Sequence, residues 1–152
     1  RRSGDRVVPV VPAPMPRQAR TDAVASRLSA ATNPPAPPPL IVGGRSAGAR
    51  VACRTAVEVG ADAVLALSFP LSGAGKSDKA RAPELRVVLE AGIPIAVVQG
   101  SSDPMGRPQE FADEFGDALP VYPCKGAHSF GAQPDDVVAA VRDWLGRAFP
   151  TK

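Results

Sequence analysis

The sequence is poor in the residues that build metal sites and disulfide frameworks. It has one histidine and two cysteines, Cys53 and Cys124, in 152 residues. The cysteines lie far apart and no apolar signal segment precedes them, which favours a cytoplasmic protein with free thiols. No cluster of cysteine and histidine has metal-ligand spacing, so we expect no metal; the chemistry predicted below needs no other cofactor. Cys124 is expected to be a small buried residue rather than a reactive thiol.

Aromatic residues and long apolar runs are also scarce. One tryptophan, one tyrosine and five phenylalanines accompany 18 lysines and arginines, which are spread along the chain and leave a net charge of only +3. A nucleic-acid surface needs a basic stripe, so we expect no nucleic-acid partner. No apolar run approaches the roughly 20 residues of a membrane span, so no membrane partner is expected either.

Proline, in contrast, is abundant, and many of the 18 prolines fall between Pro9 and Pro39. Apolar residues recur at helical spacing over 18–31, and the proline cluster at 33–39 is typical of a stiff linker. We therefore predict that residues 1–39 form a proline-rich segment with one helix. Residues 40–152 are predicted to form the single folded domain.

From residue 40 onward, apolar runs of strand length alternate with helical patterns. Continuous apolar runs are typical of strands that are covered on both faces, as in parallel sheets. The alternation predicts an α/β fold with three layers, α/β/α, around a mostly parallel sheet. The predicted strands lie at 40–42, 63–69, 93–98 and 119–122, and the predicted helices at 47–59, 83–91, 108–118 and 134–145.

The last helix has the clearest pattern. Two aspartates precede it, and Gly146 follows as a predicted stop. Its apolar residues fall on one face, which predicts core packing for the only tryptophan. That face comprises Val137, Val138, Val141, Trp144 and Leu145.

A Gly-x-Ser-x-Gly motif follows the first predicted strand and opens the first predicted helix of the domain. It places Ser46 between Gly44 and Gly48. A nucleophilic serine on a sharp strand-to-helix turn needs small neighbours, because the backbone there is strained and the hydroxyl must stand clear of the sheet. The helix that begins at Ala47 adds a positive dipole end and a backbone N–H that can stabilise an oxyanion.

A serine hydroxyl needs a base, which is usually a histidine held by a carboxylate. The only histidine, His128, follows the fourth predicted strand, and Asp103 follows the third. Each of the three residues therefore lies after a strand, at the edge of the sheet where open α/β folds place their sites. We predict a triad of Ser46 as nucleophile, His128 as base and Asp103 as the acid that orients the base.

Four blocks of the sequence together carry a family resemblance. They are, in chain order, 43–50, Phe69-Pro70-Leu71 with Gly75-Lys76, 98–100 with Asp103-Pro104, and Gly126 with 128–130. These blocks resemble the small α/β-hydrolases of the dienelactone-hydrolase-like kind. The resemblance extends from about residue 39 to 145 and is greatest to the branch that shares its domain with a histone-acetyltransferase-complex regulatory subunit. It implies the same three catalytic residues and the Ala47 N–H as one oxyanion donor.

The chain departs from that family in two ways. Ser72 replaces a histidine that usually follows the Pro-Leu pair. A full hydrolase of this type also has several strands before the nucleophile, including the loop that supplies the second oxyanion donor. We therefore expect the C-terminal half of an α/β-hydrolase fold, with an unpaired strand edge beside Ser46 that another segment, a second copy or another chain would complete.

The motif therefore predicts a serine hydrolase that cleaves an ester, thioester or related acyl bond in a small molecule. Two other interpretations remain open. The run 73–77 has the glycines, lysine and serine of a phosphate loop, although its first glycine position falls on Pro70. A non-catalytic interaction domain, or an inactive fragment with the hydrolase shape, would also fit a chain that lacks the second oxyanion donor.

Overall fold

The computed structural model describes residues 39–132 and 134–150. The helix predicted at 18–31 and the proline-rich linker lie outside these residues, so the predicted boundary between the two segments stays a prediction. Within the described part, four strands and four α-helices alternate along the chain. They are β1 (Ile41–Arg45), α2 (Ala47–Thr55), β2 (Ala63–Leu67), α3 (Ala82–Glu90), β3 (Ile95–Gly100), α4 (Pro108–Phe115), β4 (Val121–Cys124) and α5 (Asp135–Ala148).

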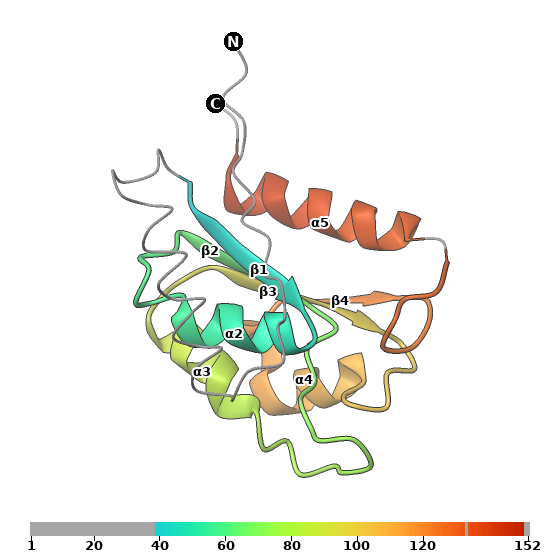
Figure 1. Ribbon diagram of the computed structural model, residues 1–152. Coiled ribbons are helices and arrows are strands. Elements are labelled where there is room, and N and C mark those ends of the chain that lie inside the picture. Colours follow the sequence, from blue (N-terminus) through green and yellow to red (C-terminus); the bar gives the residue numbers. More distant parts are fainter. Residues whose placement is uncertain (1–38, 133, 151–152) are drawn as a thin grey trace.

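The four strands form one parallel sheet in the order β1-β2-β3-β4. The three crossovers therefore all step in the same direction across the sheet. Since such crossovers are right-handed, their helices must lie on the same face. Figure 1 shows this arrangement: α2, α3 and α4 lie below the sheet and α5 lies above it. The predicted three-layer α/β/α fold with a parallel sheet is confirmed.

The main core lies between the sheet and helices α2, α3 and α4. β3 is buried along its whole length, which explains why its run is apolar without alternation. Small residues of α2 allow that helix to lie close to the sheet, and larger side chains of α3 and α4 fill the rest. Core members include Val42, Val64, Val97, Ala49, Cys53, Leu85, Val88 and Phe111.

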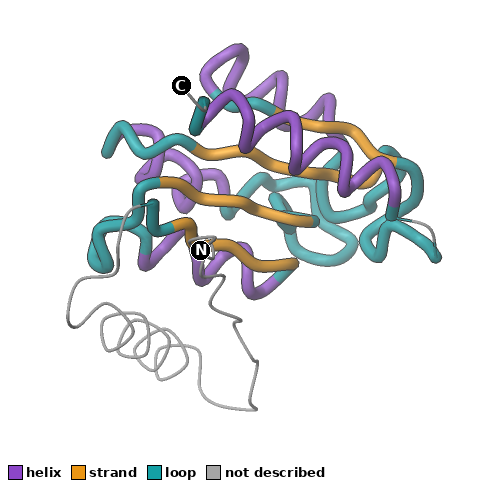
Figure 2. Tube along the Cα trace, turned by 90° about the horizontal axis from the view of Figure 1, so that it is seen from above, coloured by secondary structure: helices purple, strands orange, loops and turns teal. Residues whose placement is uncertain are grey.

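On the opposite face, α5 packs against β3 and β4, and Figure 2 shows it crossing these strands. Trp144 is buried, as predicted. Val138 was predicted on the same face but is 44% exposed. The buried stripe of this helix runs through Val137, Ala140 and Trp144.

Three predicted helix ends differ from the structure. Gly146 does not stop the last helix, because α5 continues to Ala148. Ala148 and Phe149 pack with Trp144 against the sheet, and this tertiary packing outweighs the roughly 1 kcal/mol penalty of a helical glycine. The helix predicted at 47–59 ends at Thr55 and continues as turns. The end of the helix predicted at 108–118 is a 3₁₀ turn, η1 (Gly116–Ala118).

β1 is the edge strand of the sheet. Within the described residues it pairs with β2 alone. This strand leads directly into Ser46, so the edge expected beside the candidate site is present in this part of the chain. On the α5 side of the sheet, Ile41, Leu65 and Leu67 are half-buried.

Candidate active site

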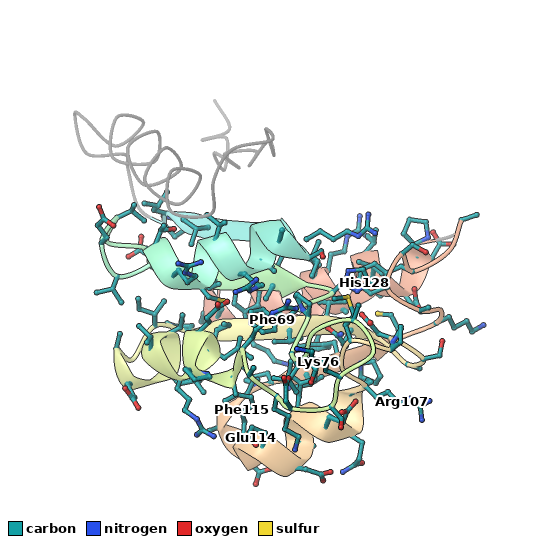
Figure 3. The ribbon with its side chains drawn as sticks, turned by 60° about the horizontal axis from the view of Figure 1, so that its bottom comes forward. Phe69, Lys76, Arg107, Glu114, Phe115 and His128 are labelled. Atoms are coloured by element: carbon teal, nitrogen blue, oxygen red, sulfur yellow. The ribbon has the colours of Figure 1, made fainter. Side chains whose placement is uncertain are left out.

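Three turns meet at the carboxyl edge of the parallel sheet. Ser46 lies between β1 and α2, Asp103 follows β3, and His128 lies between β4 and α5. The ends of neighbouring parallel strands bring residues that are distant in the sequence to one edge. His128 is labelled in Figure 3, on the chain that leads into α5.

Ser46 occupies a strained turn between its strand and its helix. Its φ is 53° and its ψ is −114°, a conformation that is rare for residues other than glycine. The Ser46 N–H donates to the Leu67 carbonyl at 2.9 Å, so the strand pairing continues to the turn. The chain then reverses at once into α2, and the serine is left half-buried.

The two glycines of the motif have different roles. A Cβ at Gly44 would lie 2.6 Å from the backbone carbon of Gly48, so the turn is too tight for any side chain there. A Cβ at Gly48 would meet nothing within 4 Å. The expected need for small residues on both sides of Ser46 is therefore correct for Gly44 and wrong for Gly48, because the close approach involves only the backbone of Gly48.

The structure brings the three predicted site residues together. The Ser46 Oγ lies 2.8 Å from the His128 Nε2, and the His128 Nδ1 lies 2.8 Å from the Asp103 Oδ2. An N–H at Nδ1 donates to the carboxylate and leaves Nε2 to accept the serine hydroxyl. This is the geometry in which a histidine can take the proton of a serine.

The environments of the acid and the base differ. The Asp103 side chain is fully buried, whereas the His128 side chain is 26% exposed. A buried carboxylate needs several donors. Besides His128, Asp103 accepts a bond from the Met105 N–H at 2.9 Å and one from the Gln99 Nε2 at 2.9 Å. The histidine ring is therefore accessible to solvent, while Asp103 is held in the protein interior.

Gln99 is a supporting residue that the sequence analysis missed. It is fully buried on β3, and its Nε2 lies 2.8 Å from the Gly106 carbonyl and 3.2 Å from the Phe69 carbonyl, in addition to its contact with Asp103. The two N–H groups of this amide therefore serve Asp103 and Gly106 best, with the longer contact to Phe69 shared, while the buried Oε1 has no partner among the described residues. Two signals pointed to it: a glutamine inside an apolar run is unusual, and Gln99 lies in the block 98–100 that carries the family resemblance.

The turn that carries His128 packs closely against the end of β3 and is hydrogen-bonded to the residues that follow it. A Cβ at Gly100 would lie 2.1 Å from the Ala127 carbonyl oxygen, so glycine is required at the end of this strand. The Ser102 N–H donates to the Gly126 carbonyl at 3.1 Å. His128 itself accepts two bonds at its carbonyl, one from the Ser68 hydroxyl at 2.8 Å and a longer one from the Arg45 Nη2 at 3.4 Å.

The Ala47 N–H belongs to the first residue of α2. A helix leaves the N–H groups of its first turn without partners inside the helix, and its dipole places positive charge there. This N–H directly follows the Ser46 carbonyl in the chain. It is therefore suited to donate to an oxyanion that forms on a group attached to Ser46.

The other chemistry-bearing residues lie apart from this site. Both cysteines are buried and free. Burial raises the pKa of the Cys53 thiol to about 12, and burial also raises the pKa of Cys124, so neither is an activated thiolate.

No group of three or more potential metal ligands occurs in the described residues. None of the helices within 39–132 and 134–150 has the length and apolar character to cross a membrane.

The run 73–77 lies in the loop after β2, whose lysine, Lys76, is labelled in Figure 3. A phosphate loop opens a helix at its lysine and hydroxyl residue. Here α3 begins only at Ala82. Instead, the Ser72 Oγ accepts a hydrogen bond from the Lys79 N–H at 3.0 Å, which links the two ends of this loop. This geometry does not support nucleotide binding by these residues.

Comparison with protein families gives a match to the alpha/beta hydrolase domain over residues 8–137. The chain belongs to this alpha/beta hydrolase family. No significant match is found among curated proteins. The family assignment agrees with the parallel sheet, the strained serine turn and the order of the three site residues along the chain.

Solved α/β-hydrolase structures share the fold at low sequence identity. A lidless α/β serine hydrolase from Xanthomonas campestris is 18% identical, with a TM-score of 0.66, and the match covers 90% of this chain and 60% of that one. A protein from X. campestris pv. campestris, assigned to the α/β hydrolase superfamily, is 18% identical, with a TM-score of 0.59 and coverages of 86% and 68%. A protein from Pectobacterium atrosepticum, assigned as a YdeN-like hydrolase, is 16% identical, with a TM-score of 0.55, and the match covers 90% of this chain and 72% of that one. This chain thus spans about 60% of the length of the first of these proteins.

Proposed function

We propose that this α/β-hydrolase domain is a serine hydrolase that cleaves an ester, thioester or related acyl bond through an acyl-Ser46 intermediate. The observation that carries the proposal is the continuous set of contacts from the Ser46 Oγ through the His128 ring to Asp103, with 2.8 Å at each step. The family and the fold make hydrolysis the expected chemistry. The three side chains supply a nucleophile, a base and a buried acid for it.

The reaction follows from these positions. The Ser46 Oγ attacks the acyl carbonyl carbon while its proton moves to the His128 Nε2. The Ala47 N–H donates to the oxyanion that forms. His128 then gives the proton to the leaving group, and the bond between the acyl carbon and that group breaks. Water next attacks the acyl-serine with His128 as base, which releases the acid and restores Ser46.

Asp103 supports both halves of this cycle. Its carboxylate holds the Nδ1–H of His128 and so keeps Nε2 free to accept a proton. When His128 becomes charged, the buried carboxylate stabilises the imidazolium. The residues in these roles need neither a metal nor an organic cofactor, and small acyl compounds are the proposed substrates.

The sequence blocks around Ser46, Asp103 and His128 further support a place among the dienelactone-hydrolase-like enzymes, in the branch that shares its domain with a histone-acetyltransferase-complex regulatory subunit. Catalysis by this chain also needs a second oxyanion donor, which the resemblance places ahead of β1. Since one such donor is worth about a hundredfold or more in rate, the proposal includes slow turnover where that donor is absent.

Hydrolysis of nitrophenyl esters and of acyl thioesters of increasing chain length tests the proposal. Wild type should release product, and Ser46→Ala and His128→Ala should lose at least about a hundredfold in kcat while they keep the wild-type circular dichroism. Ser101→Ala, on the neighbouring turn, is the matched control and should keep full activity. Equal activity in His128→Ala and wild type would show that the base is misassigned.

A non-catalytic interaction domain is the second candidate function. The observation in its favour is the edge of β1, which is unpaired within the described residues and lies beside Ser46. An unpaired edge of this kind accepts a further strand from the same or another chain. A folded protein that neither hydrolyses esters nor reacts with acylating inhibitors would favour this second function.

A further inference from the structure

Ser68 is a polar residue that contacts the backbone of His128. It directly follows β2 and is fully buried. Its Oγ donates to the His128 carbonyl oxygen at 2.8 Å, which is a short, well-formed hydrogen bond. The other donor to this carbonyl, the Arg45 Nη2, lies at 3.4 Å on an exposed side chain and contributes less.

The backbone of Ser68 is itself held by the middle of the sheet. Its N–H donates to the Val98 carbonyl at 2.9 Å, which extends the pairing of β2 with β3 by one residue. The hydroxyl therefore connects the buried middle of the sheet to the turn that carries His128. A change in the orientation of the His128 peptide would move the ring away from both Ser46 and Asp103.

The backbone conformation of Ser68 also indicates that its hydroxyl has a role. Its φ is 46°, in the left-handed region that favours glycine. A glycine would adopt this conformation without strain, so a serine here indicates that its hydroxyl is used. The only polar partner that the structure gives this hydroxyl is the His128 carbonyl.

We propose that Ser68 is a positioning residue for catalysis, which fixes the backbone of His128 so that its ring bridges Ser46 and Asp103. The role rests on the proposed serine-hydrolase function. The Ser68 hydroxyl contacts the backbone carbonyl of His128 and not the His128 ring. It acts through the carbonyl of the base, from the strand end between those that carry Ser46 and Asp103.

The first test is kinetic. Ser68→Ala and Ser68→Gly should each lower kcat for an ester substrate, and the maximal rate of fluorophosphonate labelling, by about tenfold to a hundredfold with little change in KM. The glycine variant matters because it relieves the backbone strain yet lacks the hydroxyl. Ser101→Ala removes a similar hydroxyl-to-carbonyl bond, to Cys124 at 2.9 Å, and should label at the wild-type rate.

The second test does not depend on turnover. Because His128 is the only histidine, its Nδ1–H proton gives a single downfield signal in the NMR spectrum when it is bonded to Asp103. This signal should shift or be lost in both Ser68 variants and persist in Ser101→Ala. An unchanged signal and unchanged labelling in Ser68→Ala and Ser68→Gly would overturn the role of Ser68. A wild type that never labels would instead contradict the proposed function, and the NMR comparison would still decide the role of Ser68.

Discussion

At the residue scale, the turn at Ser46 depends on close approach of backbone to backbone. Gly44 faces Gly48 at a distance that leaves no room for a Cβ, and Ser46 is strained between them. The sequence motif has glycine at both positions, but the structure leaves room for a Cβ at Gly48 and none at Gly44. This difference gives a matched pair of substitutions within one motif.

Gly44→Ala should destabilise the domain by about 1–3 kcal/mol, because the new methyl group forces the turn apart, and it should also abolish labelling of Ser46. Gly48→Ala should leave labelling intact and stabilise the domain by up to about 1 kcal/mol, since Gly48 lies in α2 with open space around it. Urea unfolding and fluorophosphonate labelling of both variants provide the measurement. Equal losses in the two variants would contradict this account of the turn.

Gln99 offers a second residue-scale prediction. Gln99→Leu removes a donor from the buried Asp103 carboxylate and leaves two backbone carbonyls without the amide, so it should cost about 1–3 kcal/mol of unfolding free energy. Gln109→Leu is the control, because Gln109 is exposed on α4 and its amide contacts only Asp113. That change should stay within about 0.5 kcal/mol. Similar unfolding midpoints for the two variants would argue against a supporting role for Gln99.

At the scale of elements, α5 shows what a helical pattern can and cannot predict. Periodicity located the helix and identified Trp144 as core, because burial on a sheet requires one apolar stripe. It placed Val138 on the same stripe, although that residue faces solvent, and it ended the helix at Gly146. Both errors concern the packing of the helix on β3 and β4, which the local sequence does not encode.

Trp144→Ala should therefore cost about 3–5 kcal/mol, since it leaves a large cavity between α5 and the sheet. Val138→Ala, in the same helix, should cost less than about 0.5 kcal/mol because Val138 packs against little. Thermal or urea unfolding of the two variants compares them directly. A comparable loss in Val138→Ala would mean that its face of α5 is covered in solution.

The supporting residues show a similar limit of prediction from sequence. The order of Ser46, Asp103 and His128 along the chain, each after a strand, was enough to predict that they meet, because parallel strands end at one edge. The supporting roles of Ser68, Gln99 and Gly100 could not be predicted, although block 98–100 carries part of the family resemblance, since these roles depend on which turn packs against which strand end. Such contacts exist only once the whole sheet has formed.

At the scale of the whole molecule, the site is assembled from every strand of the described sheet. Ser46 follows β1, Ser68 follows β2, Asp103 follows β3 and His128 follows β4. The active geometry is therefore expected to be lost together with the sheet, in one cooperative transition. Within the described residues the outer edge of β1 is unpaired and leads to Ser46, so a strand that pairs there would also border the candidate site.

The central claim is that Ser46 is an activated nucleophile. The most direct test is to treat the folded protein with a fluorophosphonate and to locate the adduct by peptide mass spectrometry. We predict one covalent adduct per chain, on Ser46, which is lost in Ser46→Ala and strongly reduced in His128→Ala and Asp103→Asn. A folded protein that forms no adduct, or forms it equally well on another serine, would contradict the claim.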